Sequence, residues 1–320
     1  MIEVSKLTKC YGDKRAVDNL SFTVERGEIL GFLGPNGAGK STTMNILTGY
    51  ISSTSGEAKI DGFDILENPT EAKKLIGYLP EHPPLYLDMT VISYLEFVYQ
   101  LKKVELPMKE HLHQICEKVK IDHVKDRIIK NLSKGYRQRV GFAQALIGNP
   151  KVLILDEPTV GLDPKQIIDI RNLIKSLGKD HTVILSSHIL SEIQATCDRV
   201  VIINKGQIVA DDTTDNLSKS MSNDFSYTAK IEGDKEKTLQ ILKGVENMKE
   251  VISLGEREQG VCEFILEAVP NTDIRRNLFD ALVSNNCRLL GLKSNEMTLE
   301  DIFLQLTSKI NITEEKEVKE

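Results

Sequence analysis

The sequence predicts an α/β protein, in which a mostly parallel sheet covered by helices is followed by a smaller α+β domain. Three observations support this fold class. Nearly continuous apolar runs alternate with helical patterns in the first two thirds, shorter alternating segments lie near the N-terminus, and the pattern changes after a polar stretch at 211–224. A chain of 320 residues accommodates one large and one small domain, expected at 1–217 and 218–320.

Buried strands are the clearest feature of the first domain. Short apolar runs rich in β-branched residues are typical of strands covered on both faces, and they occupy residues 29–33, 152–155, 183–186 and 200–203. Residues 206–210 are expected to return as the second strand of a hairpin. Segments with stronger alternation predict an antiparallel lobe beside the sheet, at 2–7, 20–24 and 58–61.

A helical region interrupts this pattern. Between about 89 and 131 the strand signal disappears, and three or so amphipathic helices fit the apolar spacing. We therefore expect an inserted helical subdomain, which spans about 88–148 when the next helix is included.

The second domain begins after the polar stretch, which is the best candidate for a linker. The expected order is strand 225–231, helix 236–242, strands 251–254 and 261–266, helix 272–283 and strand 288–293. This βαββαβ order is the ferredoxin-like arrangement. A last helix is expected around 299–307, and residues 314–320 are expected to be frayed.

Composition excludes some classes of function. The net charge of −6 counts against a nucleic-acid-binding protein, which usually presents a basic surface. No stretch approaches the roughly 18 to 20 apolar residues that cross a bilayer, and the N-terminus lacks the layout of a secretory signal. A function at a membrane would therefore need a separate protein to span it.

The cysteines and histidines predict no metal centre. The five cysteines are scattered and never spaced C-x-x-C, which is typical of reduced thiols. His111 and His113 are two positions apart, so on a helix they point to different faces. We expect both on a solvated helix.

A phosphate-binding loop follows the strand at 29–33. The segment Gly34-Pro35-Asn36-Gly37-Ala38-Gly39-Lys40-Ser41 fits G-x-x-x-x-G-K-[ST], and a helix starts at Thr42. Glycines let backbone N–H groups turn toward a phosphate chain, and the helix N-terminus adds its positive end. Lys40 is expected to reach the β- and γ-phosphates, and Ser41 is expected to bind Mg²⁺.

Two carboxylates end the strand at 152–155. Asp156 is expected to hold the Mg²⁺ shell, and Glu157 is placed to polarise the attacking water. The chain shows no Asn-Lys-x-Asp for guanine, because the segment 204–207 lacks the acid. These features predict that the bound nucleotide is ATP rather than GTP and that it binds together with Mg²⁺.

A second segment makes the interpretation specific. Leu132-Ser133-Lys134-Gly135-Tyr136-Arg137-Gln138 resembles the signature motif of the ABC ATPase family, LSGGQ, with Gly135 preserved and Lys134 in place of the first glycine. The resemblance covers about residues 1–215. It implies a P-loop NTPase cassette with a RecA-like core, an antiparallel β lobe and an inserted helical subdomain. It also implies that ATP is sandwiched between the Lys40 loop of one subunit and Ser133, Gly135 and Gln138 of a second copy.

Other residues fall where this family has functional ones. By resemblance, Tyr11 stacks on adenine, the loop containing Asp163 contacts the partner subunit, and His188 touches the γ-phosphate. Glu81 departs from the family pattern, which usually has glutamine; a similar Tyr-Leu-Pro-Glu occurs in the ABC-2 exporter branch, including drug-resistance and gliding-motility ATPases. We expect Glu81 to be a metal-side ligand. The tail 297–307 also resembles that branch.

The expected function is the ATP-hydrolysing subunit of an ABC transporter, with export favoured by the branch. It would work as a dimer at the cytoplasmic face of the membrane, on a separate multi-spanning permease. Leu85, Tyr86, Tyr94 and Phe97 either face that permease or belong to the core. Two alternatives stay open: an ABC ATPase of translation or DNA repair, and a regulatory module that has lost the chemistry.

Overall fold

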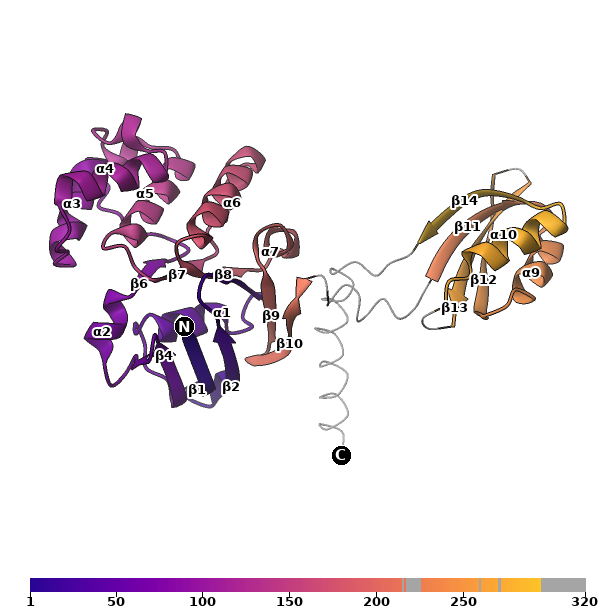
Figure 1. Cartoon of the computed structure of the whole chain (residues 1–320), viewed down its shortest axis with the longest axis horizontal. Coiled ribbons are helices and arrows are strands. Elements are labelled where there is room, and N and C mark those ends of the chain that lie inside the picture. The colour runs from indigo at the N-terminus through magenta and orange to yellow at the C-terminus, as the bar shows by residue number, and fades with distance from the viewer. Residues whose placement is uncertain (215, 217–225, 259, 270–271, 295–320) are drawn as a thin grey trace. The chain divides into compact units, whose positions relative to one another are not determined.

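The computed structural model describes residues 1–214, 216, 226–258, 260–269 and 272–294 (Figure 1). The chain divides into two compact units, Met1–Thr214 and Asp215–Glu320. None of the helices in these described ranges is both long enough and apolar enough to cross a bilayer.

A six-stranded sheet forms the centre of the first unit. Its order is β10-β9-β3-β8-β7-β6, and all neighbours are parallel except the hairpin β9–β10. Every residue of β3, β7 and β8 is buried, which explains the apolar runs at 29–33, 152–155 and 183–185. The strands are β3 (Ile29–Leu33), β6 (Ile76–Leu79), β7 (Val152–Asp156), β8 (Thr182–Ser187), β9 (Arg199–Asn204) and β10 (Gln207–Thr213).

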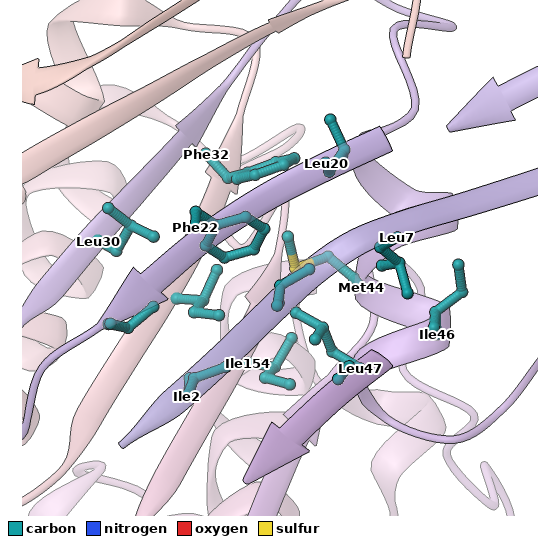
Figure 2. Close-up of a cluster of buried hydrophobic side chains, with 14 of the residues drawn as sticks. Ile2, Leu7, Leu20, Phe22, Leu30, Phe32, Met44, Ile46, Leu47 and Ile154 are labelled. Carbon is teal, nitrogen blue, oxygen red and sulfur yellow. The ribbon is translucent and has the colours of Figure 1, made fainter. Parts of the chain in front are cut away.

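An antiparallel lobe packs on this sheet. It has the order β2-β1-β4-β5, from β1 (Ile2–Tyr11), β2 (Lys14–Val24), β4 (Ser55–Ile60) and β5 (Phe63–Asp64). One continuous core joins the lobe, helix α1 (Lys40–Leu47) and the parallel sheet, and Figure 2 shows its central side chains. The rings of Phe22 in β2 and Phe32 in β3 lie 5.6 Å apart across this boundary. Burial of each large apolar side chain stabilises the unit by about 1.5–3 kcal/mol.

Helices cover the rest of the sheet and form the inserted subdomain. α3 (Val91–Leu101) is capped by Thr90, whose hydroxyl accepts from the N–H of Ser93. α4 (Met108–Lys118) follows Pro107, and α5 (Lys134–Leu146) follows Ser133. The remaining helices are α2 (Pro69–Lys74), α6 (Pro164–Gly178) and α7 (Leu190–Thr196).

The second unit has the predicted βαββαβ order. Its elements are β11 (Ser226–Glu232), α9 (Lys235–Lys243), β12 (Met248–Glu258), β13 (Val261–Ala268), α10 (Arg275–Ser284) and β14 (Arg288–Ser294). The strands form one antiparallel sheet, β12-β13-β11-β14, which is the ferredoxin-like arrangement. Phe264, Leu266, Leu278 and Leu282 lie at the centre of its core. The helix predicted at 299–307 and the tail 314–320 lie outside the described residues.

The predicted fold class is confirmed, with some local differences. Strand β6 was not predicted, although it pairs along its whole length with β7. The expectation of a solvated His111 was wrong: the side chain is buried, and its Nε2 accepts from the N–H of Gly148 at 3.0 Å. His113 is exposed, as expected.

Candidate active site

The phosphate loop is the turn between β3 and α1. Gly39 has φ 109°, and a Cβ there would lie 2.6 Å from the carbonyl oxygen of Ala16. A Cβ at Gly34 would collide with the carbonyl oxygen of Ile203. Glycine is therefore required at both positions because neighbouring backbone approaches too closely for any side chain. Ala38 lies between them, and its carbonyl accepts from the N–H of Gly206 at 2.9 Å.

Lys40 begins α1 and is held inside the site. Its side chain is only 6% exposed. Its Nζ donates to the carbonyl oxygens of Gly34 at 2.8 Å and Pro35 at 3.3 Å, and it lies 3.4 Å from Oε1 of Glu157. The ammonium therefore lies between the phosphate loop and the end of β7, and its charge is compensated within the chain.

Glu157 follows β7 directly and has an unusual backbone. Its φ is 47°, in the left-handed region that non-glycine residues rarely adopt. Its N–H lies 3.2 Å from both the carbonyl and the hydroxyl oxygen of Ser186. Its Oε2 lies 2.9 Å from Nδ1 of His188, and because a carboxylate only accepts, the ring nitrogen donates. Lys40, Glu157 and His188 thus form one connected row.

Asp156 lies one residue earlier and is almost completely buried. Its Oδ1 accepts from the hydroxyl of Ser186, the residue opposite it in the β7–β8 register. Tyr78 of β6 is close enough to respond to it: burial, and then the charge of Asp156, raise the pKa of the Tyr78 phenol. The acid is therefore fixed at the carboxyl ends of the strands, where open α/β sheets bind ligands.

A cleft of about 480 Å³ brings most of the predicted residues together. It is lined by Tyr11, Asn36, Gly37, Gly39, Lys40, Ser41, Thr42, Glu81, Glu157 and His188. Gly34, Pro35 and Ala38 shape the loop from beneath and do not line the cleft. Tyr11 ends β1 with half of its surface exposed, and Nζ of Lys9 lies 5.2 Å from its ring centroid.

Three residues of the lining were not predicted. Lys14 and Ala16 come from the start of β2, and Val160 follows the turn after Glu157. Lys14 is three residues beyond Tyr11 and pairs with it across the β1–β2 hairpin, so its spacing from Tyr11 was a usable signal. Ala16 and Val160 belong to no motif, and only the fold reveals their place.

Oxygen atoms of this site fit a magnesium ion. Ser41 and Glu81 line the cleft and Asp156 ends β7, which together supply hydroxyl and carboxylate oxygens, the donors that Mg²⁺ prefers. Within the ranges that the structure describes, no cluster of three or more His, Cys, Asp or Glu could hold a metal by itself. This donor set suits an ion that shares its ligands with a nucleotide.

The signature segment forms a second helix start away from this cleft. Ser133 caps α5, and its hydroxyl accepts from the N–H of Tyr136. Neither Ser133 nor Gly135 lines the cleft of its own chain. A Cβ at Gly135 would lie 2.7 Å from the side chain of Gln166, so the first turn of α5 packs closely on α6.

The other two residues predicted for the shared site have local partners. Gln138 is buried, and its Nε2 donates to the carbonyl oxygen of Pro158 at 2.9 Å. Asp163 caps α6 by accepting from the N–H of Gln166 at 2.9 Å. Both side chains therefore hold the loop that follows Glu157, and their part in nucleotide binding stays a prediction.

Known proteins resemble this chain over nearly its whole length. A family model described as ABC transporter matches residues 17–160. A bacitracin transport ATP-binding protein of Bacillus licheniformis, BcrA, is 34% identical and aligns over 96% of this chain and 97% of its own. A linearmycin resistance ATP-binding protein of Bacillus subtilis, LnrL, is 32% identical over 97% and 99% of the two chains.

A solved structure supports the fold of the first unit. The dimeric ATP-binding cassette MJ0796, bound to ADP and Pi, superposes with a TM-score of 0.61 and is 25% identical, over 67% of this chain and 98% of its own. The predicted family is confirmed by relatives that align from end to end. This chain belongs to the ATP-binding proteins of ABC transporters, a family of ATPases.

Proposed function

We propose that this chain is the ATP-hydrolysing subunit of an ABC-2 type exporter, and that two copies drive a separate membrane permease. One observation carries the chemistry: Lys40, Glu157 and His188 form a connected row at the phosphate loop, inside a cleft large enough for a nucleotide. A regulatory protein that does not hydrolyse ATP would not require Lys40, Glu157 and His188 to lie together in this way.

Each side chain has a role that follows from its position. The loop N–H groups and Lys40 hold the triphosphate, and Lys40 exchanges its carbonyl partners for phosphate oxygens. The carboxylate of Glu157 orients the attacking water and accepts its proton. Oε2 of Glu157 accepts from Nδ1 of His188 and so holds the imidazole ring at the wall of the cleft. From this position we expect His188 to contact the γ-phosphate.

The adenine and the metal occupy the edges of the same cleft. Tyr11 offers an exposed ring on which adenine stacks, a contact that contributes about 1–3 kcal/mol. Ser41 and Glu81 of the cleft lining, with Asp156 at the end of β7, would hold Mg²⁺, which when bound would neutralise charge on the phosphate oxygens. ATP and Mg²⁺ are therefore the substrate and cofactor that we assign.

A second copy completes the site. Ser133 and Gly135 lie at a capped helix start, which suits a phosphate, yet they do not line their own cleft. We assign them to the nucleotide of the opposite subunit, with the loop containing Asp163 at the subunit boundary. The dimeric state of the similar cassette MJ0796 supports this arrangement.

Aromatic side chains near α3 are the proposed contact with the permease. Tyr86 is 54% exposed and Phe97 is 37% exposed, and their rings lie 5.3 Å apart. Tyr94 is buried and bonded to Gln144, so it belongs to the core, and Leu85 is half-buried. Of the four candidates, Tyr86 and Phe97 therefore remain for a partner.

The names of two relatives support the direction of transport that we propose. The names of the similar proteins refer to bacitracin transport and linearmycin resistance, which favours export. A permease that spans the membrane would hold this subunit at its cytoplasmic face. The transported molecule is not assigned.

Phosphate release by the purified chain tests this proposal. We expect Mg²⁺-dependent ATP hydrolysis, and we expect Glu157→Gln to bind ATP and form dimers while hydrolysis falls by about 100-fold or more. Affinity purification should recover a multi-spanning membrane protein rather than ribosomes or DNA-repair proteins. A chain that stays monomeric and inactive with saturating ATP, even beside its permease, would contradict the proposal.

A further inference from the structure

We propose that Glu192 is a positioning residue for ATP hydrolysis, whose buried carboxylate fixes the two loops that carry Glu157 and His188. This inference rests on the function proposed above for the cleft. Glu192 itself does not line the cleft, so it acts through other residues.

Glu192 lies in the first turn of α7, and its carboxylate joins two separate segments. One oxygen, Oε2, accepts from Oγ1 of Thr159 at 2.6 Å and from Oγ of Ser187 at 3.1 Å. Thr159 is two residues beyond Glu157, and Ser187 directly precedes His188. A single atom therefore joins the loop after β7 to the last residue of β8, close to both proposed functional side chains.

The direction of these hydrogen bonds is determined by the chemistry. A carboxylate only accepts, so both hydroxyls donate to it. The oxygen of Ser187 also accepts from the N–H of Ile189 at 3.0 Å, which leaves its proton for Glu192. Glu192 is only 6% exposed, and hydrogen bonds to a buried charged group are stronger than those between neutral groups.

The carboxylate is presented from a firmly packed element. A Cβ at Gly31 of β3 would lie 2.6 Å from Ile193, the next residue of α7. The helix therefore rests directly against the central sheet. A side chain on such an element can hold a loop in place, which a side chain on another loop would do less well.

Glu157 needs this support because its own backbone is unfavourable. A left-handed φ at a non-glycine residue persists only when neighbouring contacts impose it. Ser186 accepts from the backbone N–H of Glu157, and Glu192 holds Thr159, two residues further along the same loop. Since a misplacement of about 1 Å can lower a rate about 100-fold, the loss of Glu192 should slow hydrolysis without removing a ligand of the nucleotide.

Steady-state kinetics of the full-length chain test the inference. In Glu192→Ala we expect kcat to fall about 10- to 100-fold, while the Kd of a fluorescent ADP analogue stays within about twofold of the parent. Glu192→Gln keeps an accepting oxygen, so it should recover most of the rate. The control is Thr196→Val, which alters a buried hydroxyl on the same helix and should leave kcat unchanged.

A double-mutant cycle separates positioning from general damage. Thr159→Val and Ser187→Ala should each lower kcat, and neither should lower it further when combined with Glu192→Ala, because all three act through one network. If Glu192→Ala does not fold, these two single variants and Glu192→Gln still test the network.

Three results would overturn the inference: an unchanged kcat in Glu192→Ala, an equal loss of nucleotide affinity, or fully additive losses in the cycle. Glu157→Gln in the same assay reports on the proposed function separately. If the parent hydrolyses ATP and Glu157→Gln does not, the function stands whatever Glu192 does.

Discussion

Nδ1 of His188 lies 2.9 Å from Oε2 of Glu157, a contact that joins the residues directly after β7 and β8. The other carboxylate oxygen of Glu157 lies 3.4 Å from Nζ of Lys40. Because these three residues come from widely separated parts of the sequence, their meeting is a property of the parallel sheet. The chemistry of the site therefore depends on the register of β7 and β8 as much as on the residues themselves.

Mixed dimers test whether the site is shared between subunits. Lys40→Ala and Ser133→Arg should each be inactive alone. In a mixed dimer, one site keeps both an intact Lys40 and an intact Ser133 of the partner subunit, so mixing the two variants should restore up to roughly a quarter of the parent rate by random pairing. Phosphate release after subunit exchange is the measurement. A mixture that exchanges subunits but stays inactive would contradict a site shared in this way.

Glycine substitutions test the shape of the phosphate loop. Gly39→Ala would place its Cβ 2.6 Å from a backbone carbonyl at a φ of 109°, so we expect nucleotide affinity to fall more than about tenfold. Gly27→Ala is the control, because Gly27 has φ 75° but nothing within 4 Å of a Cβ, and it lies outside the cleft lining. Fluorescent-nucleotide titration measures both. Equal affinities in the two variants would contradict the role of the close approach.

A substitution at Glu81 tests whether this residue is a ligand of Mg²⁺. We expect Glu81→Gln to need several-fold more Mg²⁺ for half-maximal hydrolysis, because a carboxylate binds this ion more tightly than an amide does. His82→Gln is a suitable control, since this neighbour is more exposed and its Nδ1 lies 3.8 Å from the Glu81 carboxylate. Mg²⁺ titrations at saturating ATP give the comparison. If Glu81→Gln keeps the Mg²⁺ dependence and the rate of the parent, Glu81 has no special role in binding Mg²⁺.

His181 should make the first unit sensitive to acid. Burial lowers the pKa of His181 below its ordinary value of about 6.5, although its Nδ1–H bond to the carbonyl of Pro150 opposes this shift. The unfolded chain then binds the proton at a higher pH than the folded chain. The contribution to stability is therefore complete above about pH 6.5 and is lost as the pH falls through the folded-state pKa.

Urea unfolding at pH 7.5 and 5.5 measures this effect. We expect the free energy of unfolding to be lower at pH 5.5, and His181→Gln to reduce the difference between the two values. His113→Gln, at an exposed position, should keep the parent difference. The explanation fails if His181→Gln responds to pH in the same way as the parent.

Motifs and continuous apolar runs made most of this fold predictable. Strands β3, β7 and β8 are buried throughout, so their sequences contain no polar interruption until they reach the site. Strand β6 has only four residues, including Gly77 and Tyr78. A run this short shows no reliable periodicity of hydrophobic residues, so the strand could not be predicted. The sequence could not reveal His111, because its burial depends on α4 meeting the turn at Gly148.

The positions of the proposed site residues were predictable where a motif includes them. Lys40, Asp156 and Glu157 follow from patterns that include their neighbours, and His188 and Tyr11 from the resemblance. Glu192 had no such signal, because its importance depends on Thr159 and Ser187 meeting it in space. Tyr94 was ambiguous in sequence, since an aromatic residue on a helix is apolar whether it faces the core or a partner.

The collision that would follow from a Cβ at Gly34 involves Ile203, and Ala38 accepts from the N–H of Gly206. The phosphate loop thus comes early in the first unit, whereas the residues that close around it, Ile203 and Gly206, come near the end of that unit. During synthesis on the ribosome, the phosphate loop emerges long before the hairpin β9–β10 that gives it its shape. A nascent chain stopped before that hairpin would carry the complete motif without the contacts that Ile203 and Gly206 make with the loop.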